Sequence, residues 1–398
     1  MAEETISTTK PARANWKMIG MLLIPILVLG GIIALFLATG GGVNLNSPAP
    51  VEALTIERYV LTQGGIDVFL RNTGPEELTL AQVVVNAAVW PFSVEPDATI
   101  PRLGKATLHL DYPWVYGEAY ALTLFSSNAI AFNLEVPVAF KTPQPTANTL
   151  WSYTLIGLYV GVIPVFLGIF WFPALRQLGR RWMTFLMAVT AGLLIFLGLE
   201  TLVEALDVAG RVGGPYQGVG LVGIGTVSTF LLLDAIARRQ QVIGRSEADR
   251  RLGVAYMIAV GIGLHNFGEG LAIGAAFSLG EIALGSFLVV GFIIQNITEG
   301  LGIIAPVLRD RPRIRQLALM GLIGGAPAIL GAWIGGFAPS PMLAVLFLAI
   351  GAGAVFEVVY EIAKLVQKDV AREPMPFTVF SGVLVGMLVL WVTGLMIK

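Results

Sequence analysis

Two short stretches near the middle of the chain repeat almost the same pattern of polar residues. Residues 265–271 read His-Asn-Phe-Gly-Glu-Gly-Leu, and residues 295–301 read Gln-Asn-Ile-Thr-Glu-Gly-Leu. Residues four apart lie on one face of a helix, so each stretch presents an imidazole or amide beside a carboxylate. Together the two faces offer nitrogen and oxygen ligands for one divalent cation, from His265, Glu269, Gln295 and Glu299.

Both stretches lie inside apolar runs long enough to cross a bilayer. Ionisable groups at membrane depth are costly, so they mark functional sites by default. The alternative is a buried hydrogen-bonded cluster that only joins helices. The repeat on a second span favours a cation site, since membrane transporters build midplane sites from related repeats.

The composition is that of a membrane protein. Of 398 residues, 56% are hydrophobic and 13% are charged, whereas soluble domains carry about 25% charged residues. The chain is therefore an α-helical polytopic protein whose surroundings are the lipid bilayer. It has no cysteine, which excludes thiolate ligands and disulfides, and its net charge of −1 gives no reason to expect nucleic acid as a partner.

The N-terminus combines a polar tail at residues 1–17 with an apolar run at residues 18–40. This run is longer than the core of about 7–15 residues typical of a signal peptide. We therefore predict a cytoplasmic tail followed by a transmembrane signal anchor. The alternative is a cleaved leader that ends near residues 40–42.

Residues 50–145 have a different character, because short β-rich segments alternate with turn signals. This pattern predicts a small antiparallel β-sandwich of six or seven strands, immunoglobulin-like in size. The expected strands are Ala53–Val60, Ile66–Arg71, Leu78–Val89, Thr107–Leu110, Glu118–Leu124 and Ala129–Phe140.

Residues 150–398 contain eight more apolar runs, which makes nine spans with the anchor. Lys and Arg gather near residues 10–17 and in every second loop after that. The positive-inside rule then places the N-terminus in the cytoplasm, and the β-domain and C-terminus outside it. The expected location is the plasma (inner) membrane. The eight runs are 151–175, 182–205, 217–237, 252–277, 282–308, 316–337, 341–363 and 376–397.

These features resemble the ZIP (Zrt/Irt-like) family of divalent metal transporters. That family has eight spans with both ends outside the cytoplasm, and it carries His-Asn-x-Pro-Glu-Gly on span four and a related motif on span five. The two stretches here lie on the corresponding spans of residues 150–398. The amides of the second stretch look most like the GufA-like bacterial and archaeal branch.

The resemblance implies a primary metal site at His265, Glu269, Gln295 and Glu299. It also implies a second site that uses Asn266 and Asn296 with the shared glutamates. The chain departs from the family at three positions: Ala326 stands where some relatives have a glutamate, and Gly268 and Thr298 stand where they often have proline.

Each of these three departures leads to its own expectation about the metal site or the helix. The alanine leaves the second site short of charge, so we expect one strong site. Gly268 can still bend a helix, and Thr298 can back-bond to a carbonyl.

Other acidic residues have two interpretations each. Glu200 and Glu204 can draw cations to an outer entrance or simply form a solvated helix end. Glu357 and Glu361 can release the ion, a role that the resemblance suggests for Glu361, or Glu361 can pair with Lys364.

Two further groups are expected to be structural. Asp234 stands one turn before Arg238, which favours an ion pair at a helix end. His109 has no second histidine or cysteine nearby on its predicted strand, which favours an ordinary surface or core histidine.

The sequence therefore predicts a transporter that moves divalent metal ions toward the cytoplasm, not an enzyme, with no resident cofactor. Zn²⁺ is the first choice of ion, with Cd²⁺, Fe²⁺, Mn²⁺ and Co²⁺ as alternatives. One rival is a non-transporting, metal-responsive membrane receptor. A weaker rival is an intramembrane zinc hydrolase, which needs three strong ligands and a water. The β-domain can contact a partner, orient a homodimer or capture metal.

Overall fold

The first part of the chain contains a single apolar helix, α1 (Trp16–Thr39). At 1.5 Å per residue it is about 36 Å long, more than the ~30 Å of a bilayer core. It coincides with the predicted anchor at 18–40, whose membrane role stays a prediction, whereas most of the predicted tail at 1–17 lies outside the described residues. The computed structural model describes residues 16–39, 51–241, 246–338, 340–372 and 376–395, in two units, 1–51 and 52–398.

The second unit begins with two antiparallel β-sheets. Their strand orders are β1-β2-β7-β5 and β4-β3-β8-β9, and β6 pairs with β3. Side chains alternate between the faces of a strand, and the buried residues of both sheets form one apolar core. The strands are β1 (Leu54–Thr62), β2 (Gly65–Asn72), β3 (Leu78–Val85), β4 (Ala88–Trp90), β5 (Ser93–Glu95), β6 (Thr99–Ile100), β7 (Lys105–Leu110), β8 (Tyr120–Ser126) and β9 (Ala131–Val136).

One predicted strand was wrong. The segment Leu78–Val89 is a hairpin of β3 and β4, because the chain turns at Asn86 and Ala87, whose φ angles are 48° and 67°. The type I′ hairpin turn requires positive φ at both central residues, and alanine is a weak signal for that conformation. The short strands β5 and β6 were also not predicted. The immunoglobulin-like character of the domain stays a prediction.

The rest of the chain is helical and makes this a multi-pass membrane protein. Among the described residues, six helical segments are long and apolar enough to cross a bilayer, and Pro376–Val392 is a shorter apolar helix. Helix α7, which carries His265 and Glu269, is 32 residues long. Its polar stretch lowers its mean hydropathy, and it is not among the six. The predicted count of nine spans stays a prediction.

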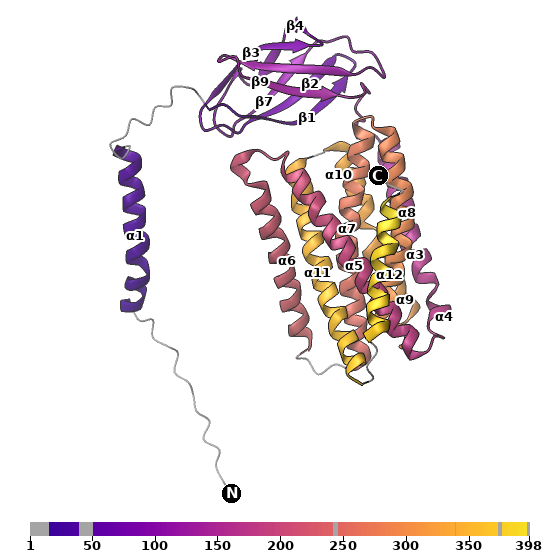
Figure 1. Ribbon diagram of the computed structural model, residues 1–398. Coiled ribbons are helices and arrows are strands. Elements are labelled where there is room, and N and C mark those ends of the chain that lie inside the picture. Colours follow the sequence, from indigo (N-terminus) through magenta and orange to yellow (C-terminus); the bar gives the residue numbers. More distant parts are fainter. Residues whose placement is uncertain (1–15, 40–50, 242–245, 339, 373–375, 396–398) are drawn as a thin grey trace. The chain divides into compact units, whose positions relative to one another are not determined.

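The helices run alongside one another (Figure 1). They are α2 (Ala147–Gly157), η2 (Leu158–Val162), α3 (Ile163–Phe170), α4 (Phe172–Leu175), α5 (Arg180–Ala209), η3 (Gly214–Tyr216), α6 (Gly218–Gln241), α7 (Glu247–Ser278), α8 (Ile282–Ile304), η4 (Ala305–Val307), α9 (Ile314–Gly325), α10 (Pro327–Phe337), α11 (Pro341–Arg372) and α12 (Pro376–Gly394).

Glycine lets two pairs of helices touch backbone to backbone. A Cβ added at Gly331 of α10 would lie 2.1 Å from the carbonyl oxygen of Phe267 in α7. A Cβ added at Gly386 of α12 would lie 2.1 Å from the carbonyl oxygen of Val189 in α5. Small residues permit this close packing in membranes, where helices gain little from the hydrophobic effect. The α7–α10 and α5–α12 pairs are therefore tightly joined.

Candidate metal centre

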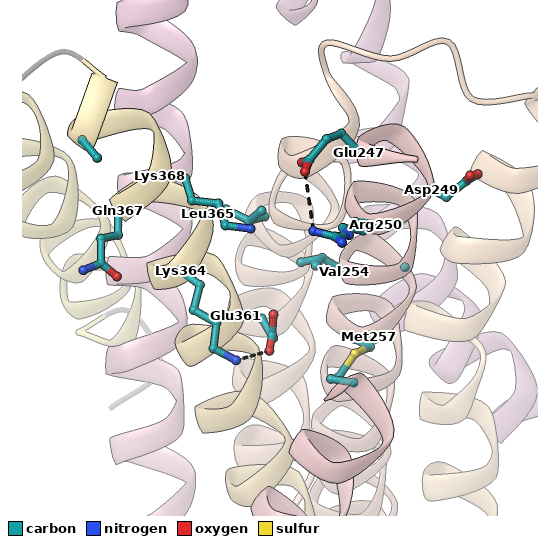
Figure 2. Close-up of a pocket in the computed structure, with 13 residues that line it drawn as sticks. Glu247, Asp249, Arg250, Val254, Met257, Glu361, Lys364, Leu365, Gln367 and Lys368 are labelled. Carbon is teal, nitrogen blue, oxygen red and sulfur yellow. Dashed lines mark hydrogen bonds and ion pairs between the residues drawn. The ribbon is translucent and has the colours of Figure 1, made fainter. Parts of the chain in front are cut away.

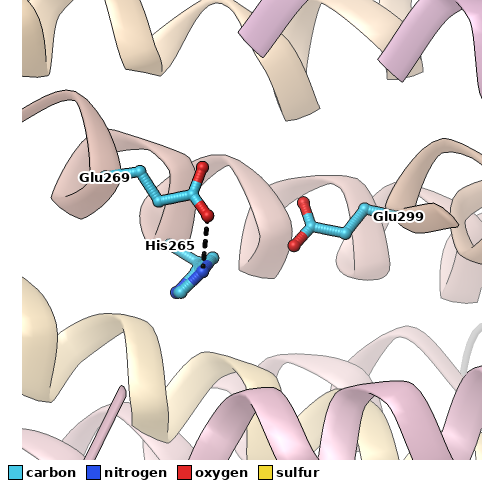
Figure 3. Close-up of side chains that lie close together, drawn as sticks. All are labelled: His265, Glu269 and Glu299. Atoms are coloured by element: carbon cyan, nitrogen blue, oxygen red, sulfur yellow. Dashed lines mark ion pairs between the residues drawn. The ribbon is translucent and has the colours of Figure 1, made fainter. Parts of the chain in front are cut away.

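Helices α7 and α8 bring four polar side chains to one buried point, which we name the α7–α8 cluster: His265, Glu269, Gln295 and Glu299. Nε2 of His265 is 3.2 Å from Oε1 of Glu269 (Figure 3). One ligand atom each from His265, Glu269 and Glu299 lie within 4.8 Å of one another. At most 6% of each of the four residues is exposed. The structure thus brings together the four residues that the motif spacing selected.

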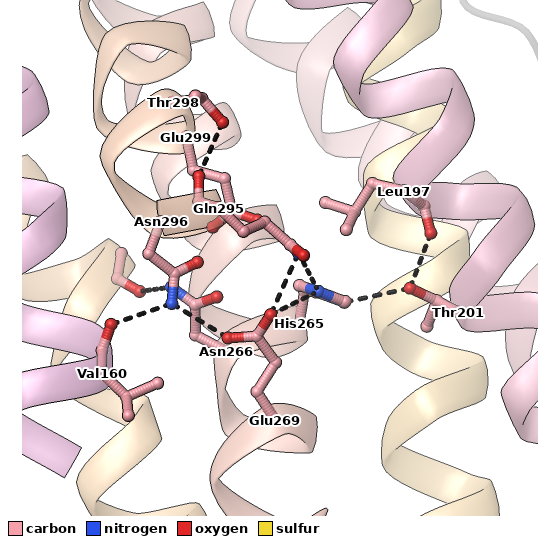
Figure 4. Close-up of polar contacts among 11 residues, drawn as sticks. Val160, Leu197, Thr201, His265, Asn266, Glu269, Gln295, Asn296, Thr298 and Glu299 are labelled. Atoms are coloured by element: carbon pink, nitrogen blue, oxygen red, sulfur yellow. Dashed lines mark hydrogen bonds and ion pairs between the residues drawn. The ribbon is translucent and has the colours of Figure 1, made fainter. Parts of the chain in front are cut away.

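The amide nitrogen of Gln295 lies between the carboxylates of the cluster (Figure 4). It is 3.0 Å from Glu269 Oε1, 3.3 Å from Glu299 Oε1 and 3.3 Å from His265 Nε2. Its two protons carry partial positive charge, so it stands where a cation would be attracted. A rotation of the amide by about 180° would present its oxygen instead. The four residues would then offer one nitrogen and three oxygen ligands, a set that suits intermediate divalent ions.

The two asparagines of the motifs are anchored through their NH₂ groups. Nδ2 of Asn296 donates to the carbonyl oxygen of Val160 and to Oε2 of Glu269, at 2.9 Å each. Nδ2 of Asn266 donates to the carbonyl oxygen of Gly324 at 3.0 Å. Their amide planes are therefore held by backbone of other helices.

The opposite ends of these amides have no such bonds. Within the described residues, Oδ1 of Asn266, Oδ1 of Asn296 and Oε2 of Glu299 are buried without a hydrogen-bond partner. A buried polar atom without a partner costs about 1–3 kcal/mol. Unpaired oxygens next to the α7–α8 cluster suit a cation, and they belong to the asparagines that the family resemblance assigned to a second site.

The carbonyl of Val160 can accept from Asn296 because its helix is interrupted there. Pro164 has no N–H, so the bond that residue 164 of a regular helix would donate to Val160 is missing. The backbone widens into the π-helical turn η2, in which the N–H of Ile163 bonds to the carbonyl of Leu158. Sequence reasoning missed this link, although a proline inside a predicted span was a signal for it.

The glycines that follow the motif glutamates permit close contact between helices. A Cβ at Gly270 would lie 2.2 Å from the carbonyl oxygen of Ala328, and one at Gly300 would lie 2.3 Å from that of Val165. Any larger residue would push α7 away from α10, or α8 away from α3, and would displace the ligands that α7 and α8 carry.

The residues that replace the family prolines differ in their effects. Helix α7 runs unbroken through Gly268. A Cβ at that glycine would lie 3.1 Å from Cδ2 of Leu348, which identifies it as a packing position. The hydroxyl of Thr298 donates to the carbonyl oxygen of Gln295 at 2.6 Å, the back-bond that we predicted.

Helix α5 contributes a residue that sequence reasoning missed. Oγ1 of Thr201 is 3.0 Å from Nδ1 of His265 and 2.8 Å from the carbonyl oxygen of Leu197. The threonine is 1% exposed. The sequence contains one weak signal for this contact, since Thr201 stands one turn before Glu204 within a predicted span.

Glu200 and Glu204 are not part of the α7–α8 cluster. Both lie on α5, and Glu204 is exposed. Glu204 is close enough for its charge to interact with those of His265 and Glu269. The predicted role of the two glutamates at an outer entrance stays a prediction.

A second group of carboxylates, which we name the α6–α11 cluster, consists of Asp234, Glu357 and Glu361. One oxygen from each lies within 4.8 Å of the others, and all three residues are buried. Glu357 is 0% exposed, and neither of its carboxylate oxygens has a hydrogen-bond partner among the described residues. Sequence reasoning assigned Asp234 to a helix end and missed that it joins the two glutamates.

The α6–α11 cluster has cations of its own. Nζ of Lys364 is 2.5 Å from Oε1 of Glu361 and 3.8 Å from Oδ1 of Asp234. Nε of Arg238 donates to Oδ2 of Asp234 at 2.7 Å. The two ion pairs that the sequence suggested, Asp234–Arg238 and Glu361–Lys364, are both present. Their carboxylates belong to the same cluster.

A cavity of about 450 Å³ reaches the α6–α11 cluster. Figure 2 shows Glu361 and Lys364 on one wall of it, and the pair Glu247–Arg250 on another. The α6–α11 cluster thus borders a cavity that residues of α7 and α11 line.

Comparison with known proteins gives a partial match. No protein-family model matches the chain. The zinc transporters ZIP10 of Homo sapiens and Mus musculus are each 34% identical to it over 82 residues, which is 21% of this chain. The match spans 10% of the length of these curated relatives. The comparison therefore indicates a partial similarity to the ZIP family, whereas the bacterial and archaeal branch stays a prediction.

Proposed function

We propose that this protein is a membrane transporter that moves divalent metal ions, Zn²⁺ foremost, across the plasma membrane toward the cytoplasm. One observation carries the proposal. An imidazole, two carboxylates and an amide from α7 and α8 converge at a buried point, where the amide nitrogen of Gln295 donates to both carboxylates. The partial similarity to zinc transporters supports the same function.

The ligand set suits transport better than permanent retention of an ion. One imidazole with oxygen ligands binds zinc less tightly than a thiolate site. Conduction requires binding that is strong enough to replace hydration and weak enough to allow release. A hydrolase would need three strong ligands and an open position for water, and the α7–α8 cluster has a single histidine.

The proposed route begins at Glu200 and Glu204, passes the α7–α8 cluster and ends at Glu357 and Glu361. The positive-inside pattern supports an orientation of this route with the N-terminus in the cytoplasm and the β-domain and C-terminus outside. The eight-span bundle of residues 150–398 would carry the route, and an immunoglobulin-like domain at residues 50–145 would lie at its outer end.

The tight helix pairs support a mechanism in which one group of helices moves against another. The α7–α10 pair carries two of the four ligands of the α7–α8 cluster, whereas the α5–α12 pair carries Glu200 and Glu204. Backbone contacts hold each pair together. Relative movement of such groups around a fixed site is the common form of alternating access.

The decisive experiment is uptake of Zn²⁺, Cd²⁺, Mn²⁺, Fe²⁺ or Co²⁺ into proteoliposomes that contain the full chain. We expect saturable uptake that is lost in His265→Ala and in Glu269→Ala. His109→Ala is the matched control, because it removes the second of the two histidines, in β7. Uptake that survives both site substitutions would exclude the α7–α8 cluster as the transport site. Metal binding without uptake would favour the receptor alternative.

A further inference from the structure

Thr201 touches the edge of the His265 ring that faces away from the other ligands (Figure 4). Oγ1 of the threonine is 3.0 Å from Nδ1 of the ring and 2.8 Å from the carbonyl oxygen of Leu197. Both side chains are almost completely buried, with 1% and 6% exposed. Water therefore does not compete for these bonds.

The direction of the bond follows from the number of protons. A hydroxyl has a single proton to donate, and a carbonyl oxygen can only accept. At 2.8 Å the Thr201 hydroxyl donates its proton to Leu197, and in this arrangement its oxygen accepts from the ring. Nδ1 of His265 then carries a proton, whether the ring as a whole is neutral or charged.

The other ring nitrogen faces the ligands. Nε2 of His265 is 3.2 Å from Oε1 of Glu269 and 3.3 Å from Nε2 of Gln295. In a neutral ring with its proton on Nδ1, the lone pair is on Nε2 and points into the α7–α8 cluster. The bond that one ring nitrogen makes decides which nitrogen is left to bind a metal.

We propose that Thr201 is a positioning residue that holds His265 as the Nδ1–H tautomer and thereby makes Nε2 the metal-binding atom. The identity of the ion rests on the proposed function, whereas the tautomer does not. Without the hydroxyl, Nδ1–H would have no acceptor, and the alternative Nε2–H tautomer would bond to Glu269. The lone pair would then point away from the other ligands, and an incoming ion would have to reverse the tautomer.

The test uses the scarcity of histidine in this chain. His265 and His109 are its two histidines, so His109→Gln leaves one imidazole to observe. ¹⁵N-histidine NMR of the metal-free full chain, at a pH where the ring is neutral, reports which nitrogen carries the proton. We expect Nδ1–H in this background and in Thr201→Ser, and a shift toward Nε2–H in the nearly isosteric Thr201→Val.

A matched control lies on the same helix. The hydroxyl of Thr190 back-bonds to Leu186 at 3.0 Å, as that of Thr201 does to Leu197, and Thr190 is 4% exposed. Thr190→Val should therefore leave the tautomer unchanged. If Thr201→Val does not fold, the spectrum of His265 in the protein that keeps Thr201 is still a test. A neutral ring with its proton on Nε2 in that protein would overturn the proposal.

Metal binding provides the second measurement. Loss of a partner that orients a metal ligand typically weakens affinity about 10–100-fold. We expect that loss of Zn²⁺ affinity in Thr201→Val, with recovery in Thr201→Ser and no change in Thr190→Val. An unchanged tautomer and affinity in Thr201→Val would refute the positioning role. Absence of Zn²⁺ binding in every variant would instead count against the proposed function and leave the tautomer result standing.

Discussion

The helical region contains two buried groups of carboxylates that are neutralised in different ways. In the α7–α8 cluster, the carboxylates face the amide protons of Gln295, which carry only partial charge, and the imidazole of His265, which is charged only when protonated. In the α6–α11 cluster, they face the ammonium of Lys364 and the guanidinium of Arg238. Buried carboxylates need a countercharge, since an isolated charge in the interior is costly.

This difference separates a cluster without a permanently charged partner from one that has two, Lys364 and Arg238. A divalent cation would supply the full charge that amide protons lack in the α7–α8 cluster. At the α6–α11 cluster it would have to compete with Lys364, so the same ion would be held less firmly there. Weaker binding at the second cluster would allow the ion to leave the protein there.

The largest expected effect comes from removing one charge from each cluster in turn. Glu269→Gln removes a carboxylate that accepts from both Gln295 and Asn296. Glu269 would give the ion a full negative charge at a buried site, where Coulomb attraction is little screened, so kcat/KM for Zn²⁺ uptake should fall about 100-fold or more. Glu361→Gln should cost less, because Asp234 and Glu357 remain in place.

Initial rates of uptake over a range of Zn²⁺ concentrations measure both variants. Equal losses would mean that the two clusters hold the ion equally firmly, and the comparison between them would fail. A larger loss in Glu361→Gln would reverse it and make the α6–α11 cluster the principal site.

A smaller effect is expected when the α6–α11 cluster is deprived of its own cation. Lys364→Met leaves the three carboxylates with Arg238 as their remaining partner. Because the Lys364 side chain is 29% exposed, we expect a loss of about 1–3 kcal/mol in stability, less than for a fully buried pair. Added Zn²⁺ should restore the stability, since the cluster would now resemble the α7–α8 cluster.

Thermal unfolding of the purified protein, with and without Zn²⁺, measures this effect. Lys368→Met is the matched control, because Lys368 lies one turn further along α11 and is exposed. Equal destabilisation by the two substitutions, or no response to Zn²⁺ in Lys364→Met, would contradict a role for the ammonium as countercharge.

The two clusters also differ in how far the sequence predicts them. The four residues of the α7–α8 cluster follow from helical periodicity within two neighbouring spans, because positions four apart must share a face. The α6–α11 cluster joins Asp234 to Glu357 across more than a hundred residues, and periodicity does not tell which distant helices are neighbours. The contacts of Asn296 with Val160 and of Thr201 with His265 escaped prediction for the same reason.

The smallest expected effect concerns the local support of the α7–α8 cluster. Thr298→Val removes the hydroxyl that donates to the carbonyl of Gln295 at 2.6 Å. Threonine is half-buried there, and one such bond contributes about 0.5–1.5 kcal/mol, so we expect a loss of at most this size in stability. The side chain of Gln295 keeps its own bonds to Glu269 and Glu299, so the KM for Zn²⁺ should stay nearly constant. A KM that rises as much as in Thr201→Val would mean that the backbone of α8, and not only its side chains, positions the amide between the carboxylates.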